Sequence, residues 1–129
     1  MEQQNNSAIL IVEDQHDVQN LLDIVLSRYG RPILHAYEAM QAWEIIRAEK
    51  PGVILLDIMM PGDLDGMDLL KMIRKDRQFN QTVIIVMSAM TQRSDFEKAL
   101  TAGANDYLSK PFHLRDLYRL LEHYSLSTH

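Results

Sequence analysis

Four charged side chains stand at the ends of apolar segments, where charge is rarely found by chance. Glu13 and Asp14 follow one such segment, Asp57 closes a second, and Lys110 ends a third just before a proline. If these segments are parallel strands lying side by side, their ends meet at one edge of the sheet. Carboxylates brought together there repel one another unless a cation lies among them. The pattern therefore predicts a site for a divalent metal ion and a phosphoryl group.

The hydrophobic pattern alternates between short apolar runs, typical of buried strands, and stripes at helical spacing. We expect strands over residues 8–12, 32–35, 53–56, 83–87 and 105–108. Each is followed by a helical stripe, represented by Leu21 and Leu22, Trp43, Leu70, Ala99 and Leu117. Five repeats of strand and helix imply an α/β fold, with a parallel sheet covered by helices on both faces.

The composition of the strands predicts their order. The first, third and fourth are solidly apolar and should be central, whereas the second and fifth are short and mixed and should be edges. Strand order 2-1-3-4-5, that of the flavodoxin-like (βα)5 doubly wound sandwich, satisfies both statements. Ligands of such sheets bind at the carboxyl ends of the strands, where the chain reverses between the first and third strands. Glu13, Asp14 and Asp57 fall at this point.

Length and composition exclude several classes of protein. A chain of 129 residues with 47% hydrophobic and 24% charged residues is expected to form one globular domain, over 8–125, with polar tails at 1–7 and 126–129. The net charge of −5 argues against direct binding of nucleic acid. No cysteine is present to form a disulfide or a thiolate metal site. Neither a signal peptide nor a membrane span is expected, so we predict a cytoplasmic protein.

Five stretches of the sequence carry a family resemblance. They are ILIVED (Ile9–Asp14), LLDIMMPG (Leu55–Gly62), DG (Asp65–Gly66), VMSA (Val86–Ala89) and GANDYLSKPF (Gly103–Phe112). Each stretch alone is a weak signal, but together they occur in the family's order and are distributed along nearly the whole chain, from residue 9 to residue 112. In this order they resemble the receiver domain of two-component response regulators, in the CheY-like superfamily.

The resemblance implies that Asp57 accepts a phosphoryl group from a phosphohistidine on a sensor histidine kinase or a phosphotransfer protein. A carboxylate suits this role because the acyl phosphate product is hydrolysable, so the signal can be reset. The alternative interpretation is that Asp57 only caps the following turn. The resemblance further implies a signalling switch that catalyses only its own phosphorylation and dephosphorylation, and not a conventional enzyme.

The resemblance also implies a metal site. Glu13, Asp14, Asp57 and the backbone carbonyl of Met59 match the positions that hold Mg²⁺, with Mn²⁺ as an alternative. Mg²⁺ prefers oxygen ligands and retains several waters. Because Glu13 is one methylene longer than aspartate, we expect it to act through water while Asp14 binds directly. An alternative role for Asp14 is that of N-cap for a helix beginning at Gln15.

Three further positions match residues that respond to phosphorylation. Ser88 and Lys110 match the residues that contact the phosphoryl group, and the Lys110–Pro111 bond matches one that is cis in the family. Tyr107 matches the aromatic switch residue, whose ring turns inward when Ser88 moves. The alternative is that Tyr107 stays half exposed at an edge strand.

The surface formed by the fourth helix, the fifth strand and the fifth helix would then change with phosphorylation. The partners implied are a downstream effector, an output domain of the same protein, or a second copy of the chain in a homodimer. The cognate kinase, the target, the oligomeric state and the extent of the natural protein stay open at this stage.

The chain departs from the family pattern at one loop. Two residues, Asp63 and Leu64, stand between the Pro-Gly and Asp-Gly pairs, where the family usually has one. The effect of the longer loop on phosphorylation is left open. A second hypothesis is that Met90, two residues beyond Ser88, shields the acyl phosphate from water.

Two rival functions from other classes remain as alternatives to the receiver function. An aspartyl-phosphate phosphohydrolase uses a similar sheet but needs a second acid two residues after the nucleophile, where this chain has Met59. A degenerate receiver that binds proteins without phosphorylation would have lost the acidic pair, Asp57 or Lys110, and all of these are present.

Overall fold

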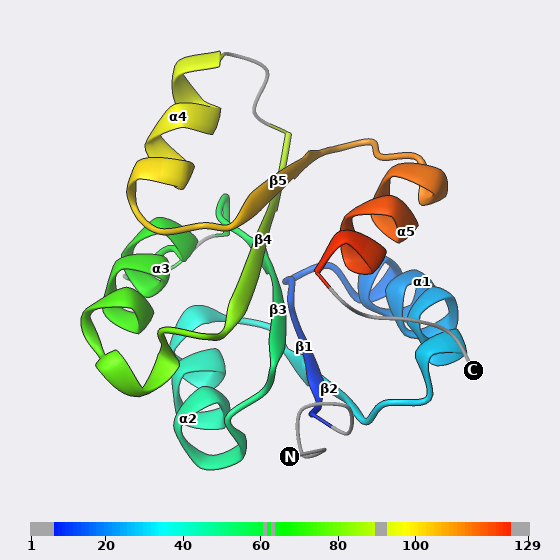
Figure 1. Cartoon of the computed structure of the whole chain (residues 1–129), viewed down its shortest axis with the longest axis horizontal. Coiled ribbons are helices and arrows are strands. Elements are labelled where there is room, and N and C mark those ends of the chain that lie inside the picture. The colour runs from blue at the N-terminus through cyan, green and yellow to red at the C-terminus, as the bar shows by residue number, and fades with distance from the viewer. Residues whose placement is uncertain (1–6, 61, 63, 90–92, 125–129) are drawn as a thin grey trace.

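The computed structural model describes residues 7–60, 62, 64–89 and 93–124, which form a parallel sheet between two layers of helices (Figure 1). The strands are β1 (Ile9–Val12), β2 (Ile33–Ala36), β3 (Val53–Asp57), β4 (Val83–Ser88) and β5 (Asp106–Ser109). The α-helices are α1 (His16–Leu26), α2 (Ala39–Glu49), α3 (Gly66–Lys75), α4 (Arg93–Thr101) and α5 (Leu114–His123). Two 3₁₀ turns, η2 (Ser27–Tyr29) and η3 (Arg77–Phe79), follow α1 and α3.

The order of the strands is β2-β1-β3-β4-β5, and all neighbours are parallel. Every residue of β1 and β3 is buried, whereas β2 and β5, at the two edges, are mostly half-buried. This confirms the predicted flavodoxin-like arrangement and its assignment of central and edge strands. Apart from Ser7, the predicted tails lie outside the described residues.

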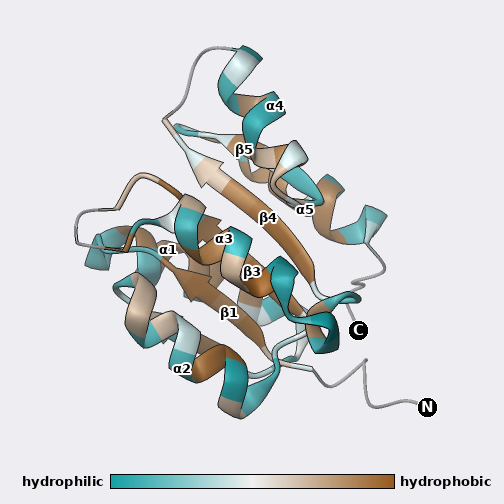
Figure 2. Ribbon diagram, turned by 90° about the vertical axis from the view of Figure 1, so that its left-hand side faces the viewer, coloured by the Kyte–Doolittle hydropathy of each residue, from teal (hydrophilic) through white to brown (hydrophobic). Residues whose placement is uncertain are grey.

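The two faces of the sheet are covered by different helices because alternate strand residues point in opposite directions. Helices α2, α3 and α4 pack on the face that includes Ile54 and Leu56, and α1 and α5 pack on the face that includes Val53 and Leu55. Figure 2 shows β1, β3 and β4 as mostly hydrophobic ribbons between helices of mixed hydropathy. None of the helices formed by the described residues is long and apolar enough to cross a lipid bilayer.

Helix α1 differs from its predicted pattern on one face. Leu21, which belongs to the predicted apolar stripe, is 47% exposed, whereas Gln19 is fully buried. Gln19 lies three residues before Leu22 and seven before Leu26, so helical periodicity places it on the same buried face as these leucines. A polar side chain thus enters the core between α1 and the sheet.

The start of α3 passes very close to the end of β3. Asp65 caps the helix, because its side chain accepts the N–H of Asp68, 2.8 Å away, in a capping box. A Cβ atom added to Gly66 would lie 2.4 Å from the Cα atom of Ile58 and 2.6 Å from the carbonyl oxygen of Asp57. The backbone can approach this closely only because Gly66 lacks a side chain.

We expect Gly66→Ala to lower the free energy of unfolding by about 1–3 kcal/mol because the new methyl group overlaps backbone atoms that cannot move aside. Helix propensity alone favours alanine over glycine by roughly 1 kcal/mol, so it predicts the opposite sign. Urea denaturation followed by circular dichroism measures the change. A stabilised variant would show that the close approach does not constrain the fold.

A single guanidinium group ties together the loops at the amino ends of β4 and β5. Arg74 donates hydrogen bonds to the carbonyl oxygens of Phe79, Thr82 and Gly103 and to the side-chain oxygen of Asn105, at 2.7–2.8 Å. Burial lowers the pKa of Arg74 from its ordinary value. The cluster lies at the edge of the sheet opposite to the carboxyl ends of the strands.

Replacement of Arg74 by lysine is expected to lower the free energy of unfolding by about 2 kcal/mol, because an ammonium cannot reproduce the planar fork of donors. The same denaturation experiment measures this loss. An unchanged midpoint would mean that water satisfies the four oxygens equally well.

Candidate functional site

The carboxyl ends of β1 and β3 bring the predicted acidic residues together. Val12 is paired with Leu56, so Glu13 and Asp57, which follow them, are adjacent. One carboxylate oxygen from each of Glu13, Asp14 and Asp57 lies within 4.8 Å of the others. Glu13 is fully buried and Asp57 is 5% exposed. The three carboxylates therefore form a nearly enclosed acidic cluster at the sheet edge, as the sequence predicted.

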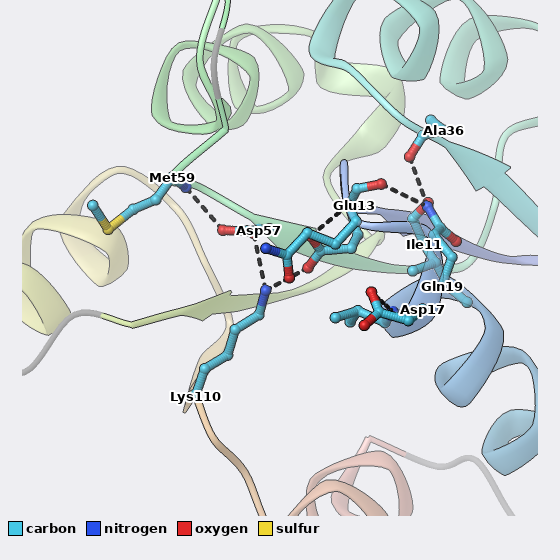
Figure 3. Close-up of polar contacts among 10 residues, drawn as sticks. Ile11, Glu13, Asp17, Gln19, Ala36, Asp57, Met59 and Lys110 are labelled. Atoms are coloured by element: carbon cyan, nitrogen blue, oxygen red, sulfur yellow. Dashed lines mark hydrogen bonds and ion pairs between the residues drawn. The ribbon is translucent and has the colours of Figure 1, made fainter.

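Lys110 reaches this cluster from the segment after β5 (Figure 3). Its Nζ atom donates hydrogen bonds to Glu13 Oε1 and to Asp57 Oδ2, the latter 3.0 Å away. Its backbone N–H donates to the carbonyl oxygen of Ser88 at 2.8 Å, which ties the lysine to the end of β4. The Lys110–Pro111 peptide bond is cis, as the resemblance implied.

Burial and charge oppose each other at this site. Burial raises the pKa of Glu13, hydrogen bonds from Lys110 and from the N–H of Gln15 lower it, and the negative charge of Asp57 raises it, with a net increase. Burial lowers the pKa of Lys110, but its hydrogen bonds and ion pairs with Glu13 and Asp57 together have a larger, opposite effect. The pKa of Lys110 is therefore raised from its ordinary value. The ammonium thus keeps its proton and compensates for two buried acids.

Both oxygens of Asp57 have partners. Oδ1 accepts the N–H of Met59 at 2.9 Å, and Oδ2 accepts Lys110. The Asp57 carboxylate therefore caps the turn that follows it and also contacts the ammonium of Lys110. The Met59 side chain is 64% exposed.

The interpretation of Asp14 as a helix cap is wrong. Helix α1 begins at His16, its N-cap is Gln15, and no side chain makes a capping hydrogen bond there. The N–H of Gln15 donates instead to Glu13 Oε2 at 3.1 Å. Asp14, which is half-buried, contributes its carboxylate to the acidic cluster.

Ser88 ends β4 beside Asp57, whose register partner is Met87. Ser88 is fully buried, and among the described residues its hydroxyl is one of two buried side-chain polar atoms without a hydrogen-bond partner. A buried hydroxyl in this state is costly and indicates a missing partner. Its position next to the acidic cluster is consistent with a ligand that brings acceptor oxygens.

Tyr107 lies farther along the sheet, in β5. It pairs with Val86, its ring lies 3.7 Å from the ring of Phe96 in α4, centroid to centroid, and it is half-buried. Of the two residues in the longer loop, Leu64 is half-buried against the core. Asp63 and Met90 lie outside the described residues. The effect of the longer loop and the shielding of an acyl phosphate by Met90 therefore stay hypotheses.

Two residues beside the acidic cluster were not predicted from the sequence. Gln19 donates to the carbonyl oxygen of Glu13, and its side-chain oxygen contacts His35 in β2. The signal that could have found Gln19 is its polar side chain at a buried helical position. No comparable local signal exists for His35, whose role depends on the pairing of β2 with β1.

The sequence model of the response regulator receiver domain matches residues 9–122. Transcriptional regulatory protein KdpE of Staphylococcus aureus is 42% identical over 111 residues, which make up 86% of this chain and 46% of KdpE. The chain thus spans less than half of the length of this curated relative.

Solved structures agree in fold. The receiver domain of sensor histidine kinase PA1611 from Pseudomonas aeruginosa, which has a magnesium ion coordinated in its active site cleft, is 31% identical, with a TM-score of 0.81 over 92% of this chain and 97% of that chain. The BeF3-activated receiver domain of Klebsiella pneumoniae RstA is also 31% identical, with a TM-score of 0.80 over 92% of this chain and 98% of that chain.

Receiver domains bind Mg²⁺ at an acidic pocket. The residues of this chain fit such an ion, because three carboxylate oxygens lie within 4.8 Å of one another and Mg²⁺ takes oxygen ligands. The family match runs from β1 to α5, and the sheet has the same strand order as the CheY-like neighbours. The chain therefore belongs to the response regulator receiver domain family of two-component signalling systems.

Proposed function

We propose that Asp57 accepts a phosphoryl group from a phosphohistidine on a sensor histidine kinase or phosphotransfer protein, in a Mg²⁺-dependent step. The observation that carries the proposal is that the Asp57 carboxylate contacts the ammonium of Lys110 and also lies within the acidic cluster with Glu13 and Asp14. A nucleophile for phosphoryl transfer needs both a fixed position and nearby positive charge.

In the proposed step, the N–P bond of the phosphohistidine breaks and a bond forms between phosphorus and a carboxylate oxygen of Asp57. The departing imidazole keeps the electron pair of the N–P bond, takes up a proton from solvent and leaves neutral. Lys110, already bonded to Asp57, moves its ammonium to the phosphoryl oxygens as the negative charge of the carboxylate is lost to the acyl phosphate. The N–H of Met59 holds the carboxylate during attack.

The residues proposed to hold the metal are Glu13, Asp14 and Asp57, with the backbone carbonyl of Met59. When bound, Mg²⁺ would offset the negative charge of the phosphoryl oxygens and of the carboxylates. Mn²⁺ has similar oxygen preferences and is proposed as a substitute. Glu13 is already engaged with Lys110, which supports contact through a water molecule and leaves Asp14 as the direct ligand.

The proposed switch begins at Ser88. Its unpartnered hydroxyl would donate to a phosphoryl oxygen, and Tyr107 would then change its packing against Phe96 in α4. A groove lies between α4, β5 and α5; its lining includes Phe96 of α4, Tyr107 of β5, Phe112 of the segment between β5 and α5, and Arg119 and Leu120 of α5. This α4-β5-α5 surface is where we propose that a partner detects phosphorylation.

Receiver domains of this family act with histidine kinases and effectors. For this chain we propose a signalling switch, with no catalysis beyond its own phosphorylation and dephosphorylation. Its output would pass to an effector protein, to an output domain of a longer protein such as KdpE, or to a second copy of the chain. The net charge of −5 supports protein partners over nucleic acid.

Incubation with acetyl phosphate and Mg²⁺ is expected to add one phosphoryl group, seen as a single mass increment by intact-protein mass spectrometry. Asp57→Asn should abolish the increment because the amide is a poor nucleophile. Asp17→Asn, which alters an exposed carboxylate at the start of α1, serves as the matched control and should retain it. Rapid turnover of unrelated phosphate esters would support a phosphohydrolase, and the lack of any modification would support a degenerate receiver.

Ser88→Ala is expected to separate stability from signalling. Removing an unpartnered buried hydroxyl should leave the free energy of unfolding unchanged or higher, because no hydrogen bond is lost. The rate of phosphorylation by acetyl phosphate should fall roughly tenfold or more, the size of one well-placed donor. Ser88→Thr keeps the hydroxyl and is the rescue variant. A normal rate in Ser88→Ala would rule out the proposed contact.

A further inference from the structure

A buried amide connects helix α1 to the backbone of the acidic pair. Gln19 is fully buried, and its Nε2 atom lies 3.1 Å from the carbonyl oxygens of Ile11 and Glu13 and 2.8 Å from that of Ala36 (Figure 3). Because all three carbonyls can only accept, the nitrogen of the amide must face them. Two N–H groups shared among three oxygens make this a tightly engaged donor.

The amide helps to hold the peptide group between Glu13 and Asp14. The N–H of Glu13 donates to the carbonyl oxygen of Ala36 at 3.0 Å, and the carbonyl of Glu13 accepts from Gln19. A peptide group is planar, so fixing the Glu13 carbonyl also fixes the direction of the Asp14 N–H. The backbone that carries two of the three clustered carboxylates is therefore anchored from the α1 side.

The orientation of the amide is set by a histidine on the edge strand. His35 Nδ1 contacts Gln19 Oε1, and since this oxygen can only accept, Nδ1 is the donor. His35 Nε2 lies 3.1 Å from Asp23 Oδ1 in α1, and this contact is a hydrogen bond when Nε2 also carries a proton. The side chain of Asp23 is 49% exposed and that of His35 is 29% exposed, so the chain of contacts runs from the acidic cluster to the protein surface.

We propose that Gln19 and His35 are positioning residues for the metal: His35 orients the Gln19 amide, and the amide fixes the backbone of Glu13 and Asp14. Neither side chain is bonded to a carboxylate of the cluster; they act on the main chain that carries the ligands. When residues that hold metal ligands in place without touching the metal are removed, the metal affinity typically falls by about 10–100-fold. The inference rests on the proposed function insofar as the cluster must bind a divalent ion.

A purely structural role would give the same contacts but a different response. Loss of a buried hydrogen bond lowers the stability of any fold, and a less stable protein can bind metal more weakly for that reason alone. A structural role and a positioning role are distinguished by the metal affinity of variants that have similar stability. These variants differ only in whether the hydrogen-bond donor to Gln19 is kept.

The experiment titrates the full chain with Mn²⁺ alone and measures free Mn²⁺ by electron paramagnetic resonance. We expect His35→Leu, which removes the donor to Gln19, to weaken the Mn²⁺ affinity about tenfold. Gln19→Met keeps the volume of the side chain but removes the amide, and we expect it to weaken the affinity by a similar factor. His35→Asn places an N–H near the position of Nδ1 and should stay within about threefold of the parent chain. Thermal melting shows that each variant is folded.

Arg74→Lys is the control for stability, because its hydrogen bonds lie at the opposite edge of the sheet. It should melt at a lower temperature and bind Mn²⁺ with unchanged affinity. The inference is overturned if His35→Leu binds as tightly as the parent chain, or if Arg74→Lys or His35→Asn loses as much affinity as His35→Leu.

The proposed function fails in a different way in the same titration. Two results would show that the cluster is not the metal site: the parent chain binds no Mn²⁺, or Asp57→Asn leaves its Mn²⁺ affinity unchanged. With either result, the proposed function would be wrong. If that dependence on Asp57 is present and the His35 and Gln19 variants behave like the parent chain, the metal site stands and only the positioning role is lost.

Discussion

The ammonium of Lys110 between Glu13 and Asp57 is the interaction on which the site depends. Two carboxylates that are almost fully withdrawn from water repel each other, and burying each charge is costly. The lysine compensates for both charges. Because it is held by two acids and not by one, the proposed function has it contact an incoming phosphoryl group while it keeps a partner in the site.

This interaction constrains the sheet around it. The acids can meet only if β1 and β3 are neighbours, and the lysine can reach them only from the edge beyond β4, where its N–H is bonded to Ser88. Gly66 adds a further constraint, because the start of α3 passes against the peptide after Asp57. The apolar core therefore determines where charge can accumulate, and the charges then determine what the edge of the sheet can bind.

The backbone that carries Glu13 and Asp14 is held by a second group of polar contacts. Gln19 engages the backbone of Glu13 from the opposite side to Lys110, so the residue is held through both its side chain and its main chain. Buried polar groups are costly unless they are satisfied, and a buried amide with acceptors on one side and a donor on the other meets that condition. The acidic cluster is thus preorganised by neutral groups as well as by charge.

The sequence alone determined the alternation of strands and helices, the central strands and the ligand edge, because hydrophobic periodicity and charge at the ends of apolar runs are local patterns. It also identified Asp57 and its partners, through motifs that each resemble the family. Only the tertiary structure decided that Gln19 is buried against the backbone of the acidic pair and that His35 contacts its side-chain oxygen. These contacts depend on how α1 and β2 pack beside β1, and residues 16 positions apart give no local sign that they will meet. The bond between Lys110 and Glu13 spans 97 positions, and it was predictable because both residues stand at the ends of apolar runs whose ends meet at one edge of a parallel sheet.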